Sequence, residues 1–268
     1  MANTQSKQTG ILLVSFGTSY ANARTALDNI EEQVKKAFPD TEIRWAYTSA
    51  FIRKKLKFSG IQIDSPEEAL VKMANDGFQK IAVQSLHIIP GEEYEKLHQT
   101  VTLFNRLPDY PIVRISPPLL YSHADLEQFS KAISEIAAQD NDKREAIVFM
   151  GHGTNHTANI YYPGLQYYLN QQSSQYILGT VEGFPGLPEV MALLAEKDIK
   201  KLKLMPLMSV AGDHAQNDMA GAQPDSWKSI LEKEGYQVTL SMHGLAEYNQ
   251  IVAIWINHLN KILDELEK

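Results

Sequence analysis

The stretch of residues 145–156 (EAIVFMGHGTNH) constrains the fold more than any other part of the chain. Its apolar, β-forming residues 146–150 predict a buried strand, which ends abruptly where two glycines bracket a histidine. Flanking glycines permit a tight turn and leave the imidazole uncrowded. His152 is therefore predicted at the carboxyl end of a parallel strand, where open α/β sheets bind their ligands.

Strand-like and helix-like segments alternate along the whole sequence. Strands are predicted at 10–15, 42–48, 80–86, 111–116, 146–150, 176–181, 201–207 and 237–241. Helices are predicted at about 23–38, from 65 onward, and at 92–104, 124–138, 157–170, 188–196, 226–234 and 247–267. This alternation predicts an α/β fold with two similar doubly wound parallel-sheet domains, joined by right-handed crossovers.

The two halves of the chain also align with each other. Residues 10–19 align with 146–155, which pairs Phe16 with His152, and residues 80–93 align with 201–214, which pairs Glu93 with His214. The second half is shorter by 15 residues between these loops. We expect an N-terminal domain of residues 1–121 and a C-terminal domain of 122–268, with a polar run at 139–143 near the boundary. The last helix, about 247–267, is a candidate to pack back on the N-terminal domain.

Composition excludes several classes of protein. The formal charge of −7 argues against general binding to nucleic acid or to a membrane surface. There is no cysteine, so thiolate metal sites and iron-sulfur clusters are excluded. No stretch approaches about 18 uninterrupted apolar residues. We expect a soluble, cytoplasmic protein, with a periplasmic location left open if a signal peptide has been removed.

Histidines and carboxylates at strand ends suggest a metal site. Two histidines with one or two carboxylates suit Co, Ni, Fe or Zn, whereas a lone Gly-His-Gly histidine equally fits a simple hydrogen bond to the backbone. A zincin site is disfavoured, because His152 and His156 lack the intervening glutamate of H-E-x-x-H. His87 aligns with Met208 within a strand pattern and is predicted either in the core or behind the residues of the site. The remaining histidines are predicted at the surface: His98, His123, His243 and His258.

Ordered motifs run through both halves of the chain. They are VSFGTS (14–19), IRK (52–54), SLHII (85–89), GEEYE (91–95), VFMGHG (148–153), MPLM (205–208), VAGDH (210–214) and NDM (217–219). Together they resemble the anaerobic cobalt chelatases, which insert Co²⁺ into sirohydrochlorin for cobalamin synthesis. The resemblance implies the class II chelatase fold, with two similar domains around a central cleft and no nucleotide requirement.

The resemblance also implies roles for individual residues. It makes His152 both a catalytic base and a metal ligand, with His214 and Glu182 completing the metal set, and it makes Glu93 a further catalytic glutamate. A second group is implied to bind the substrate: Phe16, Gly17, Thr18, Arg53 and Lys54. Arg53 and Lys54 would attract the substrate's carboxylates. The alternative is that this basic run, 53–57, is merely the solvated face of a short helix.

The function expected from these features is ATP-independent insertion of Co²⁺ into sirohydrochlorin, with release of two protons. Neutral imidazole can bind a metal or accept a proton near neutral pH. Two alternatives stay open. One is a related chelatase acting on Fe²⁺ or Ni²⁺, or on protoporphyrin, because ligand type does not separate Co, Ni and Fe. The other is a carrier that binds metal or tetrapyrrole without turnover. A homo-oligomer is compatible with either.

Overall fold

The computed structural model describes residues 7–138 and 145–268. The polar run at 139–143, which we predicted near the domain boundary, lies outside these ranges. The described chain divides into two compact units. Unit 1 comprises the residues up to 19, 28–121 and 252–268, and unit 2 comprises 20–27 and 122–251. Most of the C-terminal helix therefore groups with the N-terminal strands.

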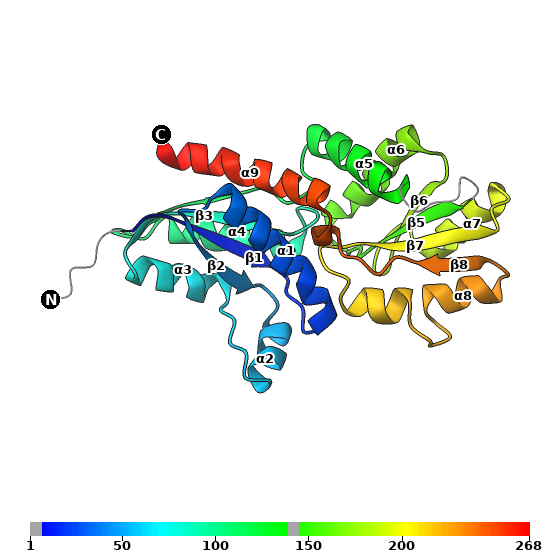
Figure 1. The fold of residues 1–268 in the computed structure, drawn as a ribbon, viewed down its shortest axis with the longest axis horizontal. Coiled ribbons are helices and arrows are strands. Elements are labelled where there is room, and N and C mark those ends of the chain that lie inside the picture. The colour runs from blue at the N-terminus through cyan, green and yellow to red at the C-terminus, as the bar shows by residue number, and fades with distance from the viewer. Residues whose placement is uncertain (1–6, 139–144) are drawn as a thin grey trace. The chain divides into compact units, whose positions relative to one another are not determined.

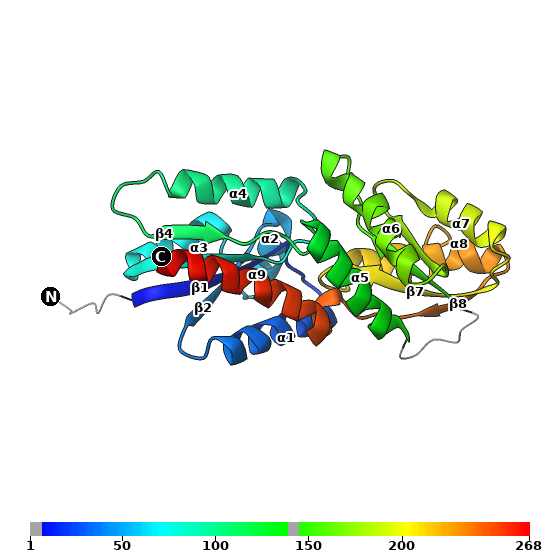
Figure 2. The ribbon, with the colours of Figure 1, turned by 90° about the horizontal axis from the view of Figure 1, so that it is seen from above.

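Unit 1 is built on a four-stranded parallel sheet in the order β2-β1-β3-β4. Helices lie on both faces of this sheet, as α1 and α4 show (Figure 2). The strands are β1 (Lys7–Ser15), β2 (Glu42–Tyr47), β3 (Phe78–Ser85) and β4 (Ile112–Ile115). The first helices of the chain are α1 (Ala21–Ala37), α2 (Ala50–Phe58), α3 (Pro66–Asn75) and α4 (Glu92–Phe104).

Unit 2 has the same architecture, with a parallel sheet in the order β6-β5-β7-β8 (Figure 1). Its strands are β5 (Ala146–Gly151), β6 (Tyr176–Thr180), β7 (Lys201–Leu207) and β8 (Gln237–Leu240). The remaining α-helices are α5 (His123–Ala138), α6 (Tyr161–Gln172), α7 (Leu187–Glu196), α8 (Trp227–Lys233) and α9 (Asn249–Glu267). Short helical turns lie at η1 (Thr157–Ile160), η2 (Ala215–Met219) and η3 (Leu245–Glu247).

The candidate site follows the buried central strand β5 of unit 2 and its two neighbours. All six residues of β5 are buried, because helices cover both faces of the sheet. In register, Gly151 at the end of β5 pairs with Thr180 of β6 and with Leu207 of β7. The carboxyl ends of these three strands therefore meet at one edge. The loops that follow them carry the candidate site.

The eight predicted strands are confirmed, with ends that differ by at most three residues. The main difference is α2, for which no helix range was predicted, although a short helix was the alternative for the basic run. Ser49 begins this helix, and its side chain accepts a hydrogen bond from the Ile52 amide. Eighteen residues (48–65) join β2 to α3, whereas six (181–186) join β6 to α7. Helix α2 thus accounts for most of the 15 residues by which the second half is shorter.

One surface prediction is wrong. His258 is 2% exposed, because it lies on the apolar side of α9, three residues after the buried Trp255 and four before the buried Ile262. Among the described residues, no helix combines the length and apolar character needed to span a bilayer.

Candidate metal centre

His152 lies directly after β5, as predicted, in a loop held by close packing. Gly153 has a φ of +80°, and a Cβ at this position would collide with the backbone of Gly183. Beneath the loop, the buried Tyr162 accepts hydrogen bonds from the amides of His152 and Gly153. Burial raises the pKa of Tyr162 to about 12, so this phenol stays neutral and supports the loop.

Glu182 is placed beside His152 by a continuation of the strand pairing. The Glu182 amide donates to the His152 carbonyl at 2.7 Å, one step beyond the end of the β5–β6 ladder. As a result, the Glu182 Oε2 atom lies 3.8 Å from Nδ1 of His152. The glutamate is exposed and the histidine is half-buried, so both can meet an ion from solvent.

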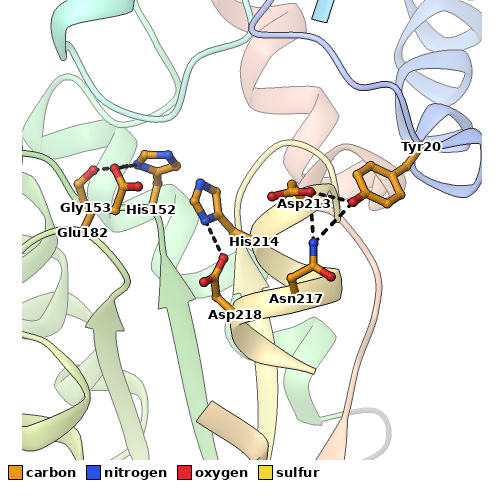
Figure 3. Close-up of polar contacts among 8 residues, drawn as sticks. All are labelled: Tyr20, His152, Gly153, Glu182, Asp213, His214, Asn217 and Asp218. Carbon is orange, nitrogen blue, oxygen red and sulfur yellow. Dashed lines mark hydrogen bonds and ion pairs between the residues drawn. The ribbon is translucent and has the colours of Figure 1, made fainter. Parts of the chain in front are cut away.

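His214 follows β7 and reaches the same place. Its ring centroid lies 4.4 Å from that of His152, with an angle of 86° between the ring planes. The ligand atoms of His152, Glu182 and His214 all lie within 4.8 Å of one another. Figure 3 shows the two imidazoles side by side, with Glu182 next to His152. Two nitrogens and one carboxylate form a donor set for a borderline divalent ion, with coordination positions left for an incoming substrate.

Hydrogen bonds fix the ring orientation of both histidines. Nδ1 of His152 lies 2.8 Å from the Gly153 carbonyl, which can only accept, so this nitrogen carries the proton. Nδ1 of His214 lies 2.8 Å from Oδ2 of Asp218 (Figure 3). In both rings the contact at Nδ1 leaves the Nε2 lone pair for a metal or a proton.

The loop that carries His214 is held by a second network. The Tyr20 hydroxyl donates to Oδ1 of Asp213 at 2.5 Å, and the Asn217 amide donates to the same oxygen at 3.0 Å (Figure 3). The hydrogen bond to Asp213 is the main cause that raises the pKa of Tyr20. We did not predict a role for Tyr20, Asp213 or Asp218. The H-x-x-x-D spacing of His214 and Asp218 was a usable signal, because residues four apart share a helix face.

The other predicted site residues lie in unit 1. Phe16 is 48% exposed, Thr18 is buried, and Gly17 has a φ of +96°. Arg53 and Lys54 lie on α2, where Lys54 is exposed. Glu93 lies in the first turn of α4. A cavity of about 330 Å³ brings three of these six together: Phe16, Arg53 and Glu93. Gly17, Thr18 and Lys54 do not line it.

Two further histidines have structural partners. Nδ1 of His156 accepts a hydrogen bond from the Ala158 amide and caps η1. Nδ1 of His87 contacts the Ser85 hydroxyl at 2.9 Å, while its Nε2 is buried without a hydrogen-bond partner in the described chain. Burial lowers the pKa of His87 to about 4, and the nearby Glu93 charge opposes this only in part.

Solved structures share this fold. SirB from Bacillus subtilis, determined with Fe³⁺, matches with a TM-score of 0.63 at 14% identity, covering 95% of each chain. CbiX, described as the terminal enzyme of siroheme biosynthesis in denitrifying bacteria, matches with a TM-score of 0.55 at 13% identity. The match covers 94% of this chain and 98% of CbiX. At these identities the likeness shows the fold alone, and the predicted class II chelatase fold is confirmed.

Sequence comparison goes further. A sirohydrochlorin cobaltochelatase, CbiKC, from Nitratidesulfovibrio vulgaris (strain Hildenborough) is 37% identical over 258 residues, which cover 96% of this chain and 92% of that protein. The sirohydrochlorin cobaltochelatase of Salmonella typhimurium (strain LT2) is 39% identical, covering 95% and 96%. The family described as cobalt chelatase (CbiK) matches residues 9–264. The chain therefore belongs to the cobalt chelatase (CbiK) family.

Proposed function

We propose that this protein is a sirohydrochlorin cobaltochelatase, which inserts Co²⁺ into the macrocycle and releases two protons. One observation carries the proposal: two imidazoles and a carboxylate have their ligand atoms within 4.8 Å of one another at the strand ends of unit 2. Membership of the cobalt chelatase family and the relatives at 37% and 39% identity support the choice of metal and macrocycle.

The donor set suits a metal that must be released. In the proposed reaction, Nε2 of His152, Nε2 of His214 and a carboxylate oxygen of Glu182 hold Co²⁺ as a substrate. Nitrogen and oxygen donors bind this ion without the softer, tighter grip of thiolates, and the sequence has no cysteine. Exposure of Glu182 gives the ion a route from solvent.

Proton removal follows from the same geometry. Two pyrrole N–H protons must leave as the metal enters the ring, and a histidine that has released the metal has a free Nε2 lone pair to accept one. His152 suits this role, because its Nδ1 proton is already held by the Gly153 carbonyl at 2.8 Å. Glu182 Oε2, 3.8 Å from the ring, would stabilise the imidazolium that forms. Glu93 is proposed as a further acid–base group of unit 1.

The proposed function also covers the cofactors, the competing metals and the physiological role. The reaction needs no nucleotide and no iron-sulfur cluster, and Ni²⁺ or Fe²⁺ would compete with Co²⁺ because the donor set does not distinguish these ions. The physiological role is cobalamin biosynthesis in the cytoplasm, without a nucleic-acid or membrane partner. Competition assays with Ni²⁺ and Fe²⁺ test the metal selectivity. Sedimentation tests whether the chain forms a homo-oligomer.

The direct test is a turnover assay. Metal-free sirohydrochlorin and Co²⁺ are mixed with a substoichiometric amount of protein and no ATP, and the absorption change is followed. Product in large excess over protein supports the enzyme. A single change equal to the protein concentration would instead identify a carrier, and no change above the uncatalysed rate would contradict both functions.

A further inference from the structure

Two loops of unit 2 carry neighbouring ligands of the metal centre. The His152 loop (152–156) follows β5 and leads into η1, and the Glu182 loop (181–186) joins β6 to α7. The side chain of Asn159, the third residue of η1, contacts the backbone of both loops. The Thr154 amide donates to its Oδ1 atom at 3.1 Å, and its Nδ2 group donates to the Phe184 carbonyl at 2.6 Å. The carboxamide therefore bridges the two loops.

The chemistry of the two partners fixes the orientation of this carboxamide. A backbone N–H can only donate and a carbonyl can only accept, so the Asn159 oxygen must face Thr154 and its nitrogen must face Phe184. Aspartate at this position would lack the donor, and leucine would lack both groups. The bridge therefore requires an amide side chain rather than any residue of similar size.

The carboxamide fills a narrow space between the loops. A Cβ on Gly183 would collide with Oδ1 of Asn159. It would also lie 2.9 Å from the Thr154 nitrogen and 3.0 Å from the Cα atom of Gly153. A side chain at position 183 and the carboxamide could not share this space. Glycine at 183 thus allows the two backbones to approach each other with Asn159 between them.

The His152 loop has supports that do not involve Asn159. The buried Tyr162 phenol accepts hydrogen bonds from the amides of His152 and Gly153. Nδ1 of His152 also contacts the Gly153 carbonyl at 2.8 Å. We therefore expect this imidazole to keep its place when Asn159 is replaced.

The Glu182 loop has fewer supports near its ligand. At its base, the amide and the hydroxyl of Thr180 both donate to the Pro185 carbonyl, at 2.7 and 2.9 Å. The Glu182 amide donates to the His152 carbonyl at 2.7 Å. Between these points, the bond from Asn159 is the only hydrogen bond that the described residues make to the loop.

The Glu182 carboxylate depends on this backbone for its position. The side chain is 57% exposed, and within the described ranges its carboxylate forms no hydrogen bond. Its Oε2 atom lies 3.8 Å from Nδ1 of His152, which is beyond hydrogen-bond distance. Ordering a long, exposed side chain around an ion costs conformational entropy, and a backbone that is already held in place lowers that cost.

We propose that Asn159 is a positioning residue, which holds the Glu182 loop against the His152 loop and so presents the Glu182 carboxylate to the metal. Asn159 does not bind the ion itself but acts through Glu182. The proposal rests on the proposed function in one respect, because it takes the ion to be the Co²⁺ that the protein inserts.

The test is a double-mutant cycle of Asn159→Ala and Glu182→Ala, with Co²⁺ binding measured by calorimetry. Asn159→Ala alone should weaken binding by about threefold to tenfold, which is the range that one net hydrogen bond is worth. In the Glu182→Ala background, the same substitution should change the affinity by less than about twofold, because no carboxylate is left to position. A merely structural role would give the same loss in both backgrounds.

Asn105 provides a matched control in unit 1. Its carboxamide also joins two backbone groups, because Nδ2 donates to the Val113 carbonyl and Oδ1 accepts from the Val113 amide, both at 2.9 Å. Asn105→Ala should lower the Tm, as Asn159→Ala does, since each loses two hydrogen bonds. Unlike Asn159→Ala, it should leave Co²⁺ affinity unchanged.

The visible absorption of bound Co²⁺ gives a second measurement. These bands depend on the donor atoms and geometry around the ion. At saturating Co²⁺, the spectrum of Asn159→Ala should shift toward that of Glu182→Ala. The spectrum of Asn105→Ala should match that of the wild type.

Either of two results would overturn the positioning role: a Co²⁺ affinity of Asn159→Ala equal to that of the wild type, or an equal loss of affinity in the two backgrounds. Neither depends on turnover. A wild type that binds Co²⁺ but fails to insert it would contradict the proposed function alone, and coupling between Asn159 and Glu182 would still support the positioning role.

Discussion

Nδ1 of His214 lies 2.8 Å from Oδ2 of Asp218, four residues further along the chain. A carboxylate in this position fixes the ring orientation and directs Nε2 toward a metal. Nδ1 of His152 instead hydrogen-bonds a neutral carbonyl, that of Gly153, at 2.8 Å, and the nearby Glu182 carboxylate lies farther away, at 3.8 Å. The two histidines therefore differ at Nδ1, and in the proposed function His214 anchors the metal whereas His152 releases the ion and accepts a proton.

The Asp218 contact gives the first prediction. Asp218→Ala should weaken Co²⁺ binding by about 10-fold to 100-fold, as removal of a carboxylate behind a histidine ligand does. Asp218→Asn, whose amide oxygen can still accept from Nδ1, should retain more affinity. Isothermal titration calorimetry with Co²⁺ measures both.

A chemically matched control exists in the same unit. His243 and Glu247 form another pair four residues apart with an Nδ1 to carboxylate distance of 2.8 Å. Neither belongs to the group of His152, Glu182 and His214. Glu247→Ala should therefore leave Co²⁺ affinity unchanged. Equal affinities for Asp218→Ala and the wild type would show that the contact does not position the ligand.

The loop glycine gives a second prediction. Gly153→Ala would place a Cβ against the Gly183 backbone in a residue with φ of +80°, which strains the loop that aligns His152 with Glu182. We expect a lower Tm and a loss of Co²⁺ binding. The control is Gly164→Ala within α6, where a Cβ meets no atom of the described chain within 4 Å and where alanine favours the helix by about 1 kcal/mol. A Gly153→Ala protein that melts and binds like the wild type would refute the packing argument.

The third prediction is that the free energy of unfolding falls at acidic pH because of His87. Its pKa is about 4 in the folded protein and about 6.5 when unfolded, so the unfolded chain binds more protons between these values. The stabilisation from neutral His87 is present above pH 6.5 and is lost as pH falls toward 4, by at most about 3 kcal/mol. Urea unfolding of the wild type and His87→Gln at pH 7.5 and pH 5 checks this. The wild type should lose more stability on acidification, and parallel losses would exclude His87 as a cause.

The fold could be predicted because burial leaves a strong pattern. Strand β5 is apolar at every position except its closing glycine, because helices cover both faces of the sheet. The glycines with positive φ that follow β1 and β5 mark where these strands end. Helix α2 was only an alternative at the level of sequence, because just Leu56 among its nine residues is buried, which leaves little periodic signal. The surface prediction for His258 was wrong because it did not take account of the apolar face of α9, on which this residue lies.

The candidate site was only partly accessible from sequence. Gly-His-Gly after a strand locates His152 by local rules alone. Glu182 depended on the family resemblance, since nothing in a Val-Glu-Gly sequence distinguishes a ligand from a solvated acid. The proximity of Glu182 to His152 arises from strand pairing between residues that lie 30 positions apart. Asn159 gave no signal, because its contact with Phe184 joins two loops that meet only in the folded chain.

The central claim is that His152, Glu182 and His214 bind the Co²⁺ that the protein inserts. Calorimetric titration of Co²⁺ into the wild type, His152→Ala, Glu182→Gln and His214→Ala tests it most directly, with the exposed His123→Ala as control. We predict one site per chain in the wild type and in His123→Ala, and affinity at least about tenfold lower in each of the other three, as expected when a ligand is removed. Unchanged Co²⁺ affinity in all three variants would contradict the assignment.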